Sequence, residues 1–168
     1  MASTLALFDL DNTLLAVDSD YLWGRFLAEA GLVDGDDHER RNAQYLAQYT
    51  AGALDIHEFL AFALAPLARL PLDTLIEARA QFVDRHIRPG IAVHAPALLA
   101  RHRAAGDVLV IVTATNRFVT APIAALLGAD ALIATDPQMD GGRFTGRALD
   151  PPCFREGKVA NLERWRTR

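Results

Sequence analysis

Residues 107–113 read DVLVIVT, the clearest strand pattern in the sequence. Because this run is apolar and rich in β-branched residues, it predicts a strand buried on both faces, as strands of parallel sheets are. A helix is predicted before it, over residues 92–105, and another after it, over residues 118–127. A further apolar run over residues 130–135 predicts the next strand. This alternation predicts an α/β fold with a doubly wound parallel sheet.

The first part of the sequence adds one strand and a block of helices. Residues 4–10 (TLALFDL) are apolar and bounded by polar residues, which predicts a buried strand of the same sheet. Helical spacing of apolar residues then predicts four helices, over residues 19–32, 37–51, 55–69 and 72–87. Arg88-Pro89-Gly90 is a turn signal that ends this block. We therefore expect an α/β core domain of residues 1–17 and 88–168, with an all-helical cap domain of residues 18–87 inserted after the first strand.

The C-terminal part predicts a hairpin and a last helix. Residues 139–149 (MDGGRFTGRAL) are typical of a hairpin that turns around Asp140-Gly141-Gly142. Residues 155–166 have helical spacing, with Val159, Leu162 and Trp165 on one side. This side is expected to pack on the sheet.

Composition excludes several classes of function. The chain has 168 residues, of which 51% are hydrophobic and 23% are charged, as in ordinary globular proteins. Its net charge of -4 gives no electrostatic case for binding nucleic acid or an anionic membrane. Cys153 is the only cysteine, so no disulfide can form within the chain and a reducing compartment is expected. No signal peptide and no apolar run of about 18 residues is found, which predicts a soluble cytoplasmic protein.

Two carboxylates, Asp9 and Asp11, stand at the end of the first predicted strand in the stretch FDLDNTLL. Side chains alternate along a strand, so both are expected to point the same way, about 6–7 Å apart. Neighbouring carboxylates repel unless a cation lies near them, and Mg²⁺ is held by one or two carboxylates together with phosphate and water. The alternative is a pair of ordinary solvated aspartates. A calcium loop is disfavoured, because Leu14 stands where that loop needs Gly.

Three motifs of this sequence resemble those of the haloacid dehalogenase superfamily. FDLDNTLL is similar to the first motif, D-x-D-x-T after an apolar strand. Thr113 after DVLVIV is similar to the second, and Lys158 in REGKVANL to the third. The helical insert resembles the cap of the phosphoserine phosphatase-like branch (subfamily IB), so the core is expected to be a Rossmann-like core of that family. DSDYLWGRF and DGGRFTGRA…CFREGK resemble a bacterial subgroup whose members are described as histidinol-phosphate or phosphoserine phosphatases.

The resemblance implies an Mg²⁺-dependent phosphomonoester hydrolase. In it, Asp9 would attack phosphorus and form an aspartyl-phosphate, and Asp11 would protonate the leaving oxygen and later activate water. The Asp9 side chain and the Asp11 backbone carbonyl would hold Mg²⁺. The Thr113 hydroxyl and the Ala114 amide would bind phosphate oxygens. Lys158 would neutralise developing charge at a helix N-terminus, which itself favours anions.

Three further residues are candidates for substrate binding. Asp18 and Asp20 lie where the cap is expected to meet the core, although helix capping and packing explain them about as well. Asn116 either contacts phosphate or starts the helix that follows the second strand. The expected ligand is a small phosphomonoester of the phosphoserine or histidinol phosphate type, and neither nucleic acid nor a membrane is expected as a partner.

One part of the family pattern is not found in the sequence. The fourth motif supplies an acidic metal ligand after a further strand, and the chain ends at Arg168 before such a strand. Asp136 and Asp140 precede Lys158 and so stand on the wrong side of it. We therefore expect weak binding of Mg²⁺ and an exposed edge on the first strand. The alternative function is that of a truncated, catalytically impaired chain that binds a phosphate ligand or a protein partner.

Overall fold

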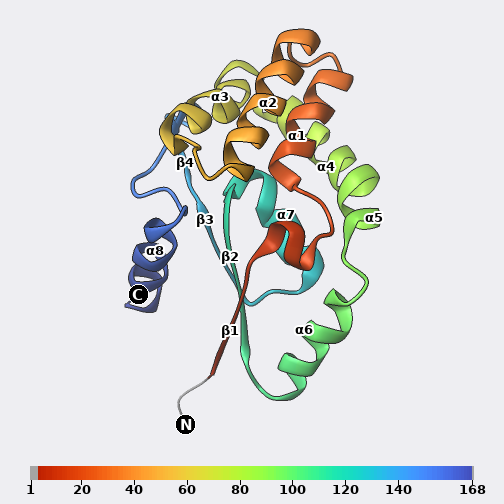
Figure 1. Cartoon of the computed structure of the whole chain (residues 1–168), viewed down its shortest axis with the longest axis vertical. Helices are drawn as coiled ribbons and strands as arrows, with labels where there is room; N and C mark the ends of the chain where they lie inside the picture. Colours follow the sequence, from red (N-terminus) through yellow and green to blue (C-terminus); the bar gives the residue numbers. More distant parts are fainter. Residues whose placement is uncertain (1–3, 168) are drawn as a thin grey trace.

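A computed structural model describes residues 4–167 of the chain. At its centre lies a parallel sheet of three strands in the order β1-β2-β3 (Figure 1). The strands are β1 (Leu5–Phe8), β2 (Val108–Asn116) and β3 (Ala131–Thr135). The central strand β2 pairs in parallel with both neighbours, and its register with β3 shifts after Val112. The parallel sheet expected from the alternating pattern is confirmed, although β2 runs three residues beyond its predicted end at Thr113.

Helices and a hairpin surround this sheet. The helices are α1 (Ser19–Glu29), α2 (Gly35–Thr50), α3 (Ile56–Arg69), α4 (Leu72–Phe82), the short turns Val83–Ile87 and α5 (Arg88–Gly90), α6 (Ala95–Ala104), α7 (Arg117–Leu127) and α8 (Glu156–Arg166). The hairpin consists of β4 (Pro137–Asp140) and β5 (Arg143–Ala148). Its turn residues Gly141 and Gly142 both have positive φ, a conformation that glycine adopts without strain, so the predicted turn is confirmed.

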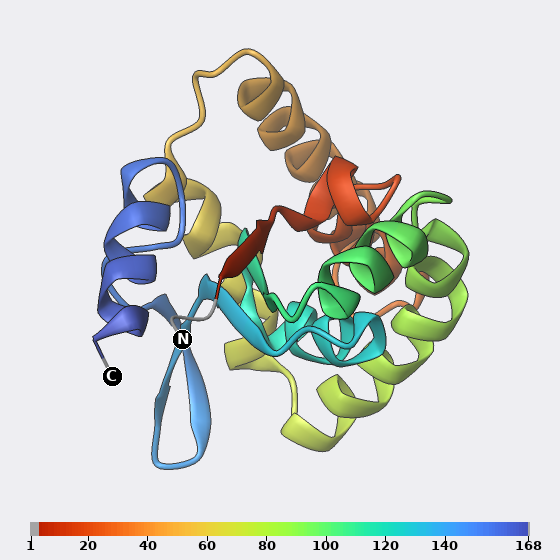
Figure 2. The ribbon, with the colours of Figure 1, turned by 90° about the horizontal axis from the view of Figure 1, so that it is seen from below.

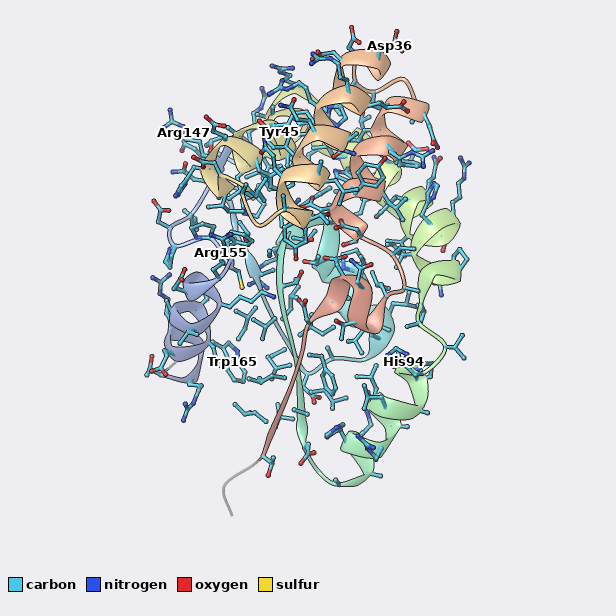
Figure 3. All side chains as sticks on the ribbon, viewed as in Figure 1. Asp36, Tyr45, His94, Arg147, Arg155 and Trp165 are labelled. Carbon is cyan, nitrogen blue, oxygen red and sulfur yellow. The ribbon has the colours of Figure 1, made fainter. Side chains whose placement is uncertain are left out.

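Helices pack on both faces of the sheet, because successive residues of β2 point to opposite sides. Leu109 belongs to a hydrophobic cluster that includes side chains of α6 and α7. The next residue, Val110, belongs to a second cluster with Leu162 and Trp165 of α8. Figure 2 shows α8 on one side of the sheet and α6 and α7 on the other, and Figure 3 labels Trp165 on α8. The predicted doubly wound arrangement is therefore confirmed. Val159 was expected on the same buried side of α8, and this is wrong, since it is 62% exposed.

The four helices predicted between β1 and β2 are all present, with shifted ends. Three of them begin after an aspartate whose side chain accepts backbone N–H groups of the first turn, as N-caps do. These N-caps are Asp18, Asp34 and Asp55. Short carboxylate side chains thus explain why α1, α2 and α3 begin where they do.

The connections into and out of this helical block lie side by side. The Ala16 amide donates to the Gly90 carbonyl at 2.8 Å, and the Ala92 amide donates to the Leu14 carbonyl at 3.0 Å. Because residues 91 and 92 are extended in this pairing, α6 begins at Ala95 and not at residue 92 as predicted. The pairing fixes the position of the helical block at the end of the sheet where β1 finishes (Figure 1).

Helical block and sheet share one hydrophobic core. A single cluster contains Phe8 and Ile111 from the sheet together with Trp23, Phe26 and Phe82 from the helices. The division into a core of residues 1–17 and 88–168 and a cap of residues 18–87 stays a prediction.

No single helix within residues 4–167 is both long and apolar enough to cross a membrane. Only the pair Ile56–Arg69 and Leu72–Gly90 reaches that length and composition together, and the two parts are bent by 116°.

Candidate active site

The first motif forms a turn at the carboxyl end of β1. The strand ends at Phe8, Asp9 follows in extended conformation, and residues Leu10–Leu14 make a wide turn closed by the Leu15 amide on the Leu10 carbonyl at 2.9 Å. Leu10, Leu14 and Leu15 are fully buried, so the apolar residues of the motif anchor the turn in the core. Asp11 therefore does not lie in the strand as predicted, and alternation of strand side chains is not what brings it beside Asp9.

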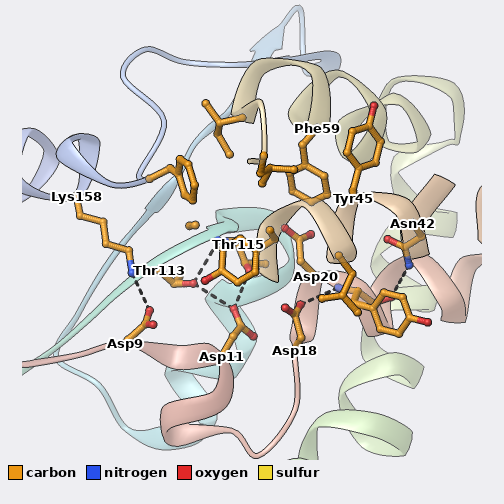
Figure 4. A pocket seen from close by; sticks show the side chains of 17 residues that line it. Asp9, Asp11, Asp18, Asp20, Asn42, Tyr45, Phe59, Thr113, Thr115 and Lys158 are labelled. Atoms are coloured by element: carbon orange, nitrogen blue, oxygen red, sulfur yellow. Dashed lines mark hydrogen bonds and ion pairs between the residues drawn. The ribbon is translucent and has the colours of Figure 1, made fainter. Parts of the chain in front are cut away.

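A cavity of about 620 Å³, partly open to solvent, lies between this turn and the helical block. Figure 4 shows the side chains around it. The motif side of the cavity is formed by Asp9, Asp11, Thr113, Ala114, Thr115 and Lys158. The helical side is formed by Asp18, Asp20, Tyr21, Asn42, Tyr45, Leu46, Tyr49, Leu54, Ile56 and Phe59, and Phe154 completes the wall.

Lys158 and Asp9 form an ion pair beside the carboxyl end of β1. The Lys158 ammonium donates to Asp9 Oδ1 at 2.9 Å, although the two residues are 149 positions apart in the chain. Lys158 is near the start of α8, and Asp9 directly follows β1. The structure thus brings the first and third motifs into direct contact.

Asp11 is held by a network of donors. Its Oδ1 accepts the Ser19 amide at 2.7 Å, and its Oδ2 accepts the hydroxyls of Thr115 at 2.9 Å and Thr113 at 3.5 Å (Figure 4). The pKa of Asp11 is raised to about 6, mainly by burial and also by the negative charge of Asp18, while the hydrogen bonds from Ser19 and Thr115 act in the opposite direction. A carboxyl group with such a pKa carries a proton more readily than an ordinary aspartate does.

Two more carboxylates face the cavity from the start of α1. Asp18 caps this helix, because its Oδ1 accepts the Tyr21 amide at 2.9 Å. Asp20 lies in the first turn, and within residues 4–167 no group donates a hydrogen bond to its carboxylate. Burial raises the pKa of Asp20 well above its usual range, and the charges of Asp18 and Asp11 raise it further.

Asn116 is the predicted site residue that the structure places elsewhere. Its Oδ1 accepts the Val119 amide at 3.2 Å and so caps α7, and its side chain is buried outside the cavity. This is the helix-start role that the sequence analysis left open beside phosphate binding. Ala114, by contrast, lines the cavity as predicted.

Sequence reasoning did not find Thr115 or the aromatic wall. Thr115 is two residues after Thr113 on β2, and this spacing along a strand puts both side chains on one face, a signal that was present. Tyr45, Leu46 and Tyr49 were recognised only as the apolar face of a helix. Phe154 had no signal, because it follows an irregular segment and reaches the cavity only in the folded chain.

Gly157 determines how α8 approaches the sheet, and a substitution there is expected to be destabilising. A Cβ atom at this position would lie 1.9 Å from the Pro152 carbonyl oxygen, so α8 and Lys158 would have to move. We expect Gly157→Ala to lower the free energy of unfolding by about 1–3 kcal/mol in urea denaturation, as overpacking does. Gly35→Ala is the control, because no atom lies within 4 Å of its Cβ position. Equal stability of the two variants would contradict this prediction.

Oxygen donors at the end of β1 fit a hard cation such as Mg²⁺. Asp9 uses Oδ1 in the pair with Lys158, and within residues 4–167 no side chain donates to its Oδ2. Both carboxylate oxygens of Asp11 accept hydrogen bonds, so its backbone carbonyl is the better candidate ligand. No cluster of three or more His, Cys, Asp or Glu side chains suited to a metal occurs in the described part of the chain. Asp136 is paired with Arg117, away from this site.

Comparisons with known proteins agree with the motifs. The profile of the haloacid dehalogenase-like hydrolase family matches residues 6–168. A histidinol-phosphatase of Neisseria meningitidis serogroup C (strain 8013) is 39% identical over 162 residues, which cover 96% of this chain and 73% of the relative. An "inhibition of morphological differentiation protein" of Streptomyces azureus is 33% identical over 149 residues, which cover 85% of this chain and 53% of the relative.

Solved structures show the same fold. A protein of unknown function from Bordetella pertussis Tohama I has a TM-score of 0.91 at 44% identity, covering 98% of this chain and 74% of that chain. A phosphoserine phosphatase, solved as a phospho-aspartyl intermediate analogue, has a TM-score of 0.69 at 20% identity, covering 99% and 72%. The second likeness supports the fold alone. The profile match over almost the whole sequence and the 39% identical relative show that the chain belongs to the haloacid dehalogenase-like hydrolase family.

Proposed function

We propose that the chain is an Mg²⁺-dependent phosphomonoester hydrolase that acts on a small phosphorylated metabolite through an aspartyl-phosphate. Family membership and the phosphatase names of its relatives support the enzyme class. The observation that carries the proposal is the meeting of the three motifs in one cavity at the carboxyl ends of β1 and β2. Ligands of open parallel sheets bind at this edge.

Asp9 is the proposed nucleophile. Its carboxylate faces the cavity and is paired with Lys158, which keeps a positive charge beside the attacking oxygen. Attack on phosphorus would form an aspartyl-phosphate and release the alcohol oxygen. Lys158 would remain close to the phosphoryl oxygens at the start of α8 and offset their charge.

Asp11 is the proposed general acid and base. It would donate a proton to the leaving oxygen in the first step and accept a proton from the attacking water in the second. The Ser19 amide and the Thr115 hydroxyl hold its carboxylate in place, so Thr115 is a positioning residue. The Thr113 hydroxyl, which also lines the cavity, and the Ala114 amide are the proposed ligands of phosphate oxygens.

The Asp9 carboxylate and the Asp11 backbone carbonyl are the proposed ligands of Mg²⁺. When bound, the ion would supply positive charge that reduces repulsion between the Asp9 carboxylate and the phosphate. Mg²⁺ needs few ligands from the protein, because water and substrate phosphate complete its coordination.

The substrate is proposed to be of the phosphoserine or histidinol phosphate type. The 39% identical relative is named a histidinol-phosphatase, and the cavity of this chain is bounded by polar and aromatic side chains. Asp18 and Asp20, on the helical side of the cavity, are the proposed contacts to the organic part of the substrate.

Removal of the metal is the direct test of this function. We expect the chain to release phosphate from para-nitrophenyl phosphate with Mg²⁺, EDTA to reduce the rate to background, and excess Mg²⁺ to restore it. The thermal midpoint should change little with EDTA, which separates loss of chemistry from unfolding. Release that is unaffected by the chelator would contradict the metal-dependent mechanism.

A second candidate function is binding without catalysis. It is supported by the finding that the described residues contain no group of three or more His, Cys, Asp or Glu side chains arranged to hold a metal ion. If the folded chain releases no phosphate from a panel of small phosphomonoesters with Mg²⁺, yet binds inorganic phosphate, this second candidate replaces the first.

A further inference from the structure

The helical side of the cavity contains a carboxylate that the proposed chemistry does not use. Asp20 lies on α1, lines the cavity, and receives no hydrogen bond from any residue in the range 4–167 (Figure 4). Asp20 is partly buried, and its carboxylate is therefore available to a ligand that enters the cavity.

The start of α1 does not by itself explain this carboxylate. The Ser19 amide donates to Asp11 and the Tyr21 amide donates to Asp18, so the nearest free donors of the helix are already used. The helix dipole contributes only about 0.3–1 kcal/mol to an acidic residue in the first turn. Repulsion from Asp18 and Asp11 acts against that contribution.

The balance of charge in the cavity favours a positively charged organic group. Lys158 is the one cationic residue among the described residues of the lining. The positive charges of Lys158 and Mg²⁺ would be balanced by the negative charges of Asp9, Asp11 and the substrate phosphate. Asp18 and Asp20 then remain on the other side, where the described lining offers no cationic side chain to match them.

No arginine is among the described residues that line the cavity and could bind a carboxylate of the substrate. Arg155 is the arginine nearest to Lys158 in the sequence. Its guanidinium donates to the Gly52 carbonyl at 2.7 Å and lies over the Phe154 ring. Arg117 is paired with Asp136. A substrate carboxylate would therefore lie near Asp18 and Asp20 without a positive charge beside it. Repulsion between like charges at short range disfavours such a substrate.

Aromatic rings surround the same part of the cavity. Tyr45 and Phe59 lie with their ring centroids 5.5 Å apart, edge to face, and Tyr49 and Phe154 lie 6.4 Å apart. Ring faces attract ammonium groups and stack on flat rings. In Figure 4, Lys158 and Asp9 are on one side of the cavity and Asn42 and Tyr45 on the other, with Asp20 between them.

From these observations we propose that the cavity selects phosphorylated amino alcohols, phosphomonoesters that carry a cationic amine and no carboxylate, with Asp20 as the residue that binds the amine. This inference rests on the proposed phosphatase function and decides between its two substrate types. It favours compounds such as histidinol phosphate over phosphoserine.

The test compares four phosphomonoesters that differ in these two groups. Histidinol phosphate and O-phosphoethanolamine carry an amine only, O-phosphoserine carries an amine and a carboxylate, and glycerol phosphate carries neither. We expect kcat/KM for the first two to exceed that for the last two by about tenfold or more. Asp20→Asn should lower the ratio of O-phosphoethanolamine to glycerol phosphate by about tenfold or more. Asp36→Asn, an exposed aspartate of α2, should leave that ratio unchanged.

Two results would overturn the inference while leaving the phosphatase function intact. They are O-phosphoserine turnover equal to that of the amino alcohol phosphates, and an unchanged ratio in Asp20→Asn. If no ester is hydrolysed, including para-nitrophenyl phosphate, the proposed phosphatase function is wrong. The inference about Asp20 is then tested by a binding measurement. Calorimetric titration with histidinol should then show binding that Asp20→Asn weakens about tenfold or more, and equal binding would overturn the inference.

Discussion

Asp9→Asn is expected to lower phosphate release from para-nitrophenyl phosphate by about 10⁴-fold or more, the scale on which removal of a nucleophile acts in other hydrolases. An amide oxygen is a poor nucleophile, and its neutral side chain is also a weaker ligand for Mg²⁺. Both effects follow from changing one carboxylate, because Asp9 is proposed both to attack phosphorus and to hold Mg²⁺. No other carboxylate of the cavity combines these two roles.

Loss of folding does not account for such an effect. The Asp9 side chain is 45% exposed, and within residues 4–167 it is paired only with Lys158. Ion pairs of this exposure contribute about 0–1 kcal/mol to stability, so the variant should unfold in urea at nearly the concentration found for the wild type. Asp36→Asn is the matched control, since it removes an exposed carboxylate far from the cavity and should keep full activity.

The phosphoenzyme gives an independent measurement. Acid quenching of the wild type during turnover should leave a phosphoryl group on Asp9, detected by mass spectrometry of the peptide that contains it. Asp9→Asn should carry none. A phosphoryl group on another residue would exclude Asp9 as the nucleophile. So would a variant rate above about 1% of the wild-type rate, which is a loss of less than about 10²-fold.

Much of the fold could be predicted because its patterns are local. The run DVLVIVT predicts a buried strand, and Asp18 and Asp55 mark the starts of α1 and α3, whereas α2 begins at Gly35, two residues before its predicted start. The ends of elements were less predictable, because they depend on partners distant in sequence. Residues 91 and 92 pair with Leu14–Ala16, and this contact delays the start of α6.

The residues of the site could be predicted where a family motif identifies them in the sequence. Asp9, Asp11, Thr113 and Lys158 all line one cavity, as the motifs implied. The turn that carries Asp11 was not foreseen, since the positive φ of Asn12 and the burial of Leu10 and Leu14 appear only in the folded chain.

The unpaired carboxylate of Asp20 was equally hidden in the sequence. An aspartate in the first turn of a helix usually serves the helix itself, and sequence offers no means to see that its neighbours already take the free amides. Only the hydrogen bonds of Ser19 and Tyr21 show that Asp20 is left without a donor.

Asp11→Asn is expected to act differently on different esters, and this difference identifies an acid. An alkyl phosphate needs a proton on its leaving oxygen, so its turnover should fall by about 10²–10⁴-fold. Nitrophenolate leaves without protonation, so the first step with para-nitrophenyl phosphate should be far less affected. The raised pKa of Asp11, which burial causes, is in the direction that an acid requires.

The second chemical step should fail with both esters in this variant. Water needs a base to attack the aspartyl-phosphate, and an asparagine cannot accept its proton. We therefore expect a burst of nitrophenol of about one equivalent per protein, followed by a slow steady rate and a phosphoenzyme that persists on Asp9. The wild type should release nitrophenol at a constant rate without a burst, and a smaller fraction of it should be phosphorylated under the same conditions.

The structure indicates that Asp11→Asn will fold, so that these kinetics report chemistry. An asparagine oxygen can still accept the Ser19 amide, and its NH₂ group can donate to the hydroxyls of Thr113 and Thr115, which accept as readily as they donate. Stopped-flow measurement of both esters, beside urea denaturation of the variant, checks this. Equal losses for the alkyl and nitrophenyl esters, without a burst, would remove Asp11 from proton transfer and leave it a positioning residue for the turn that carries Asp9.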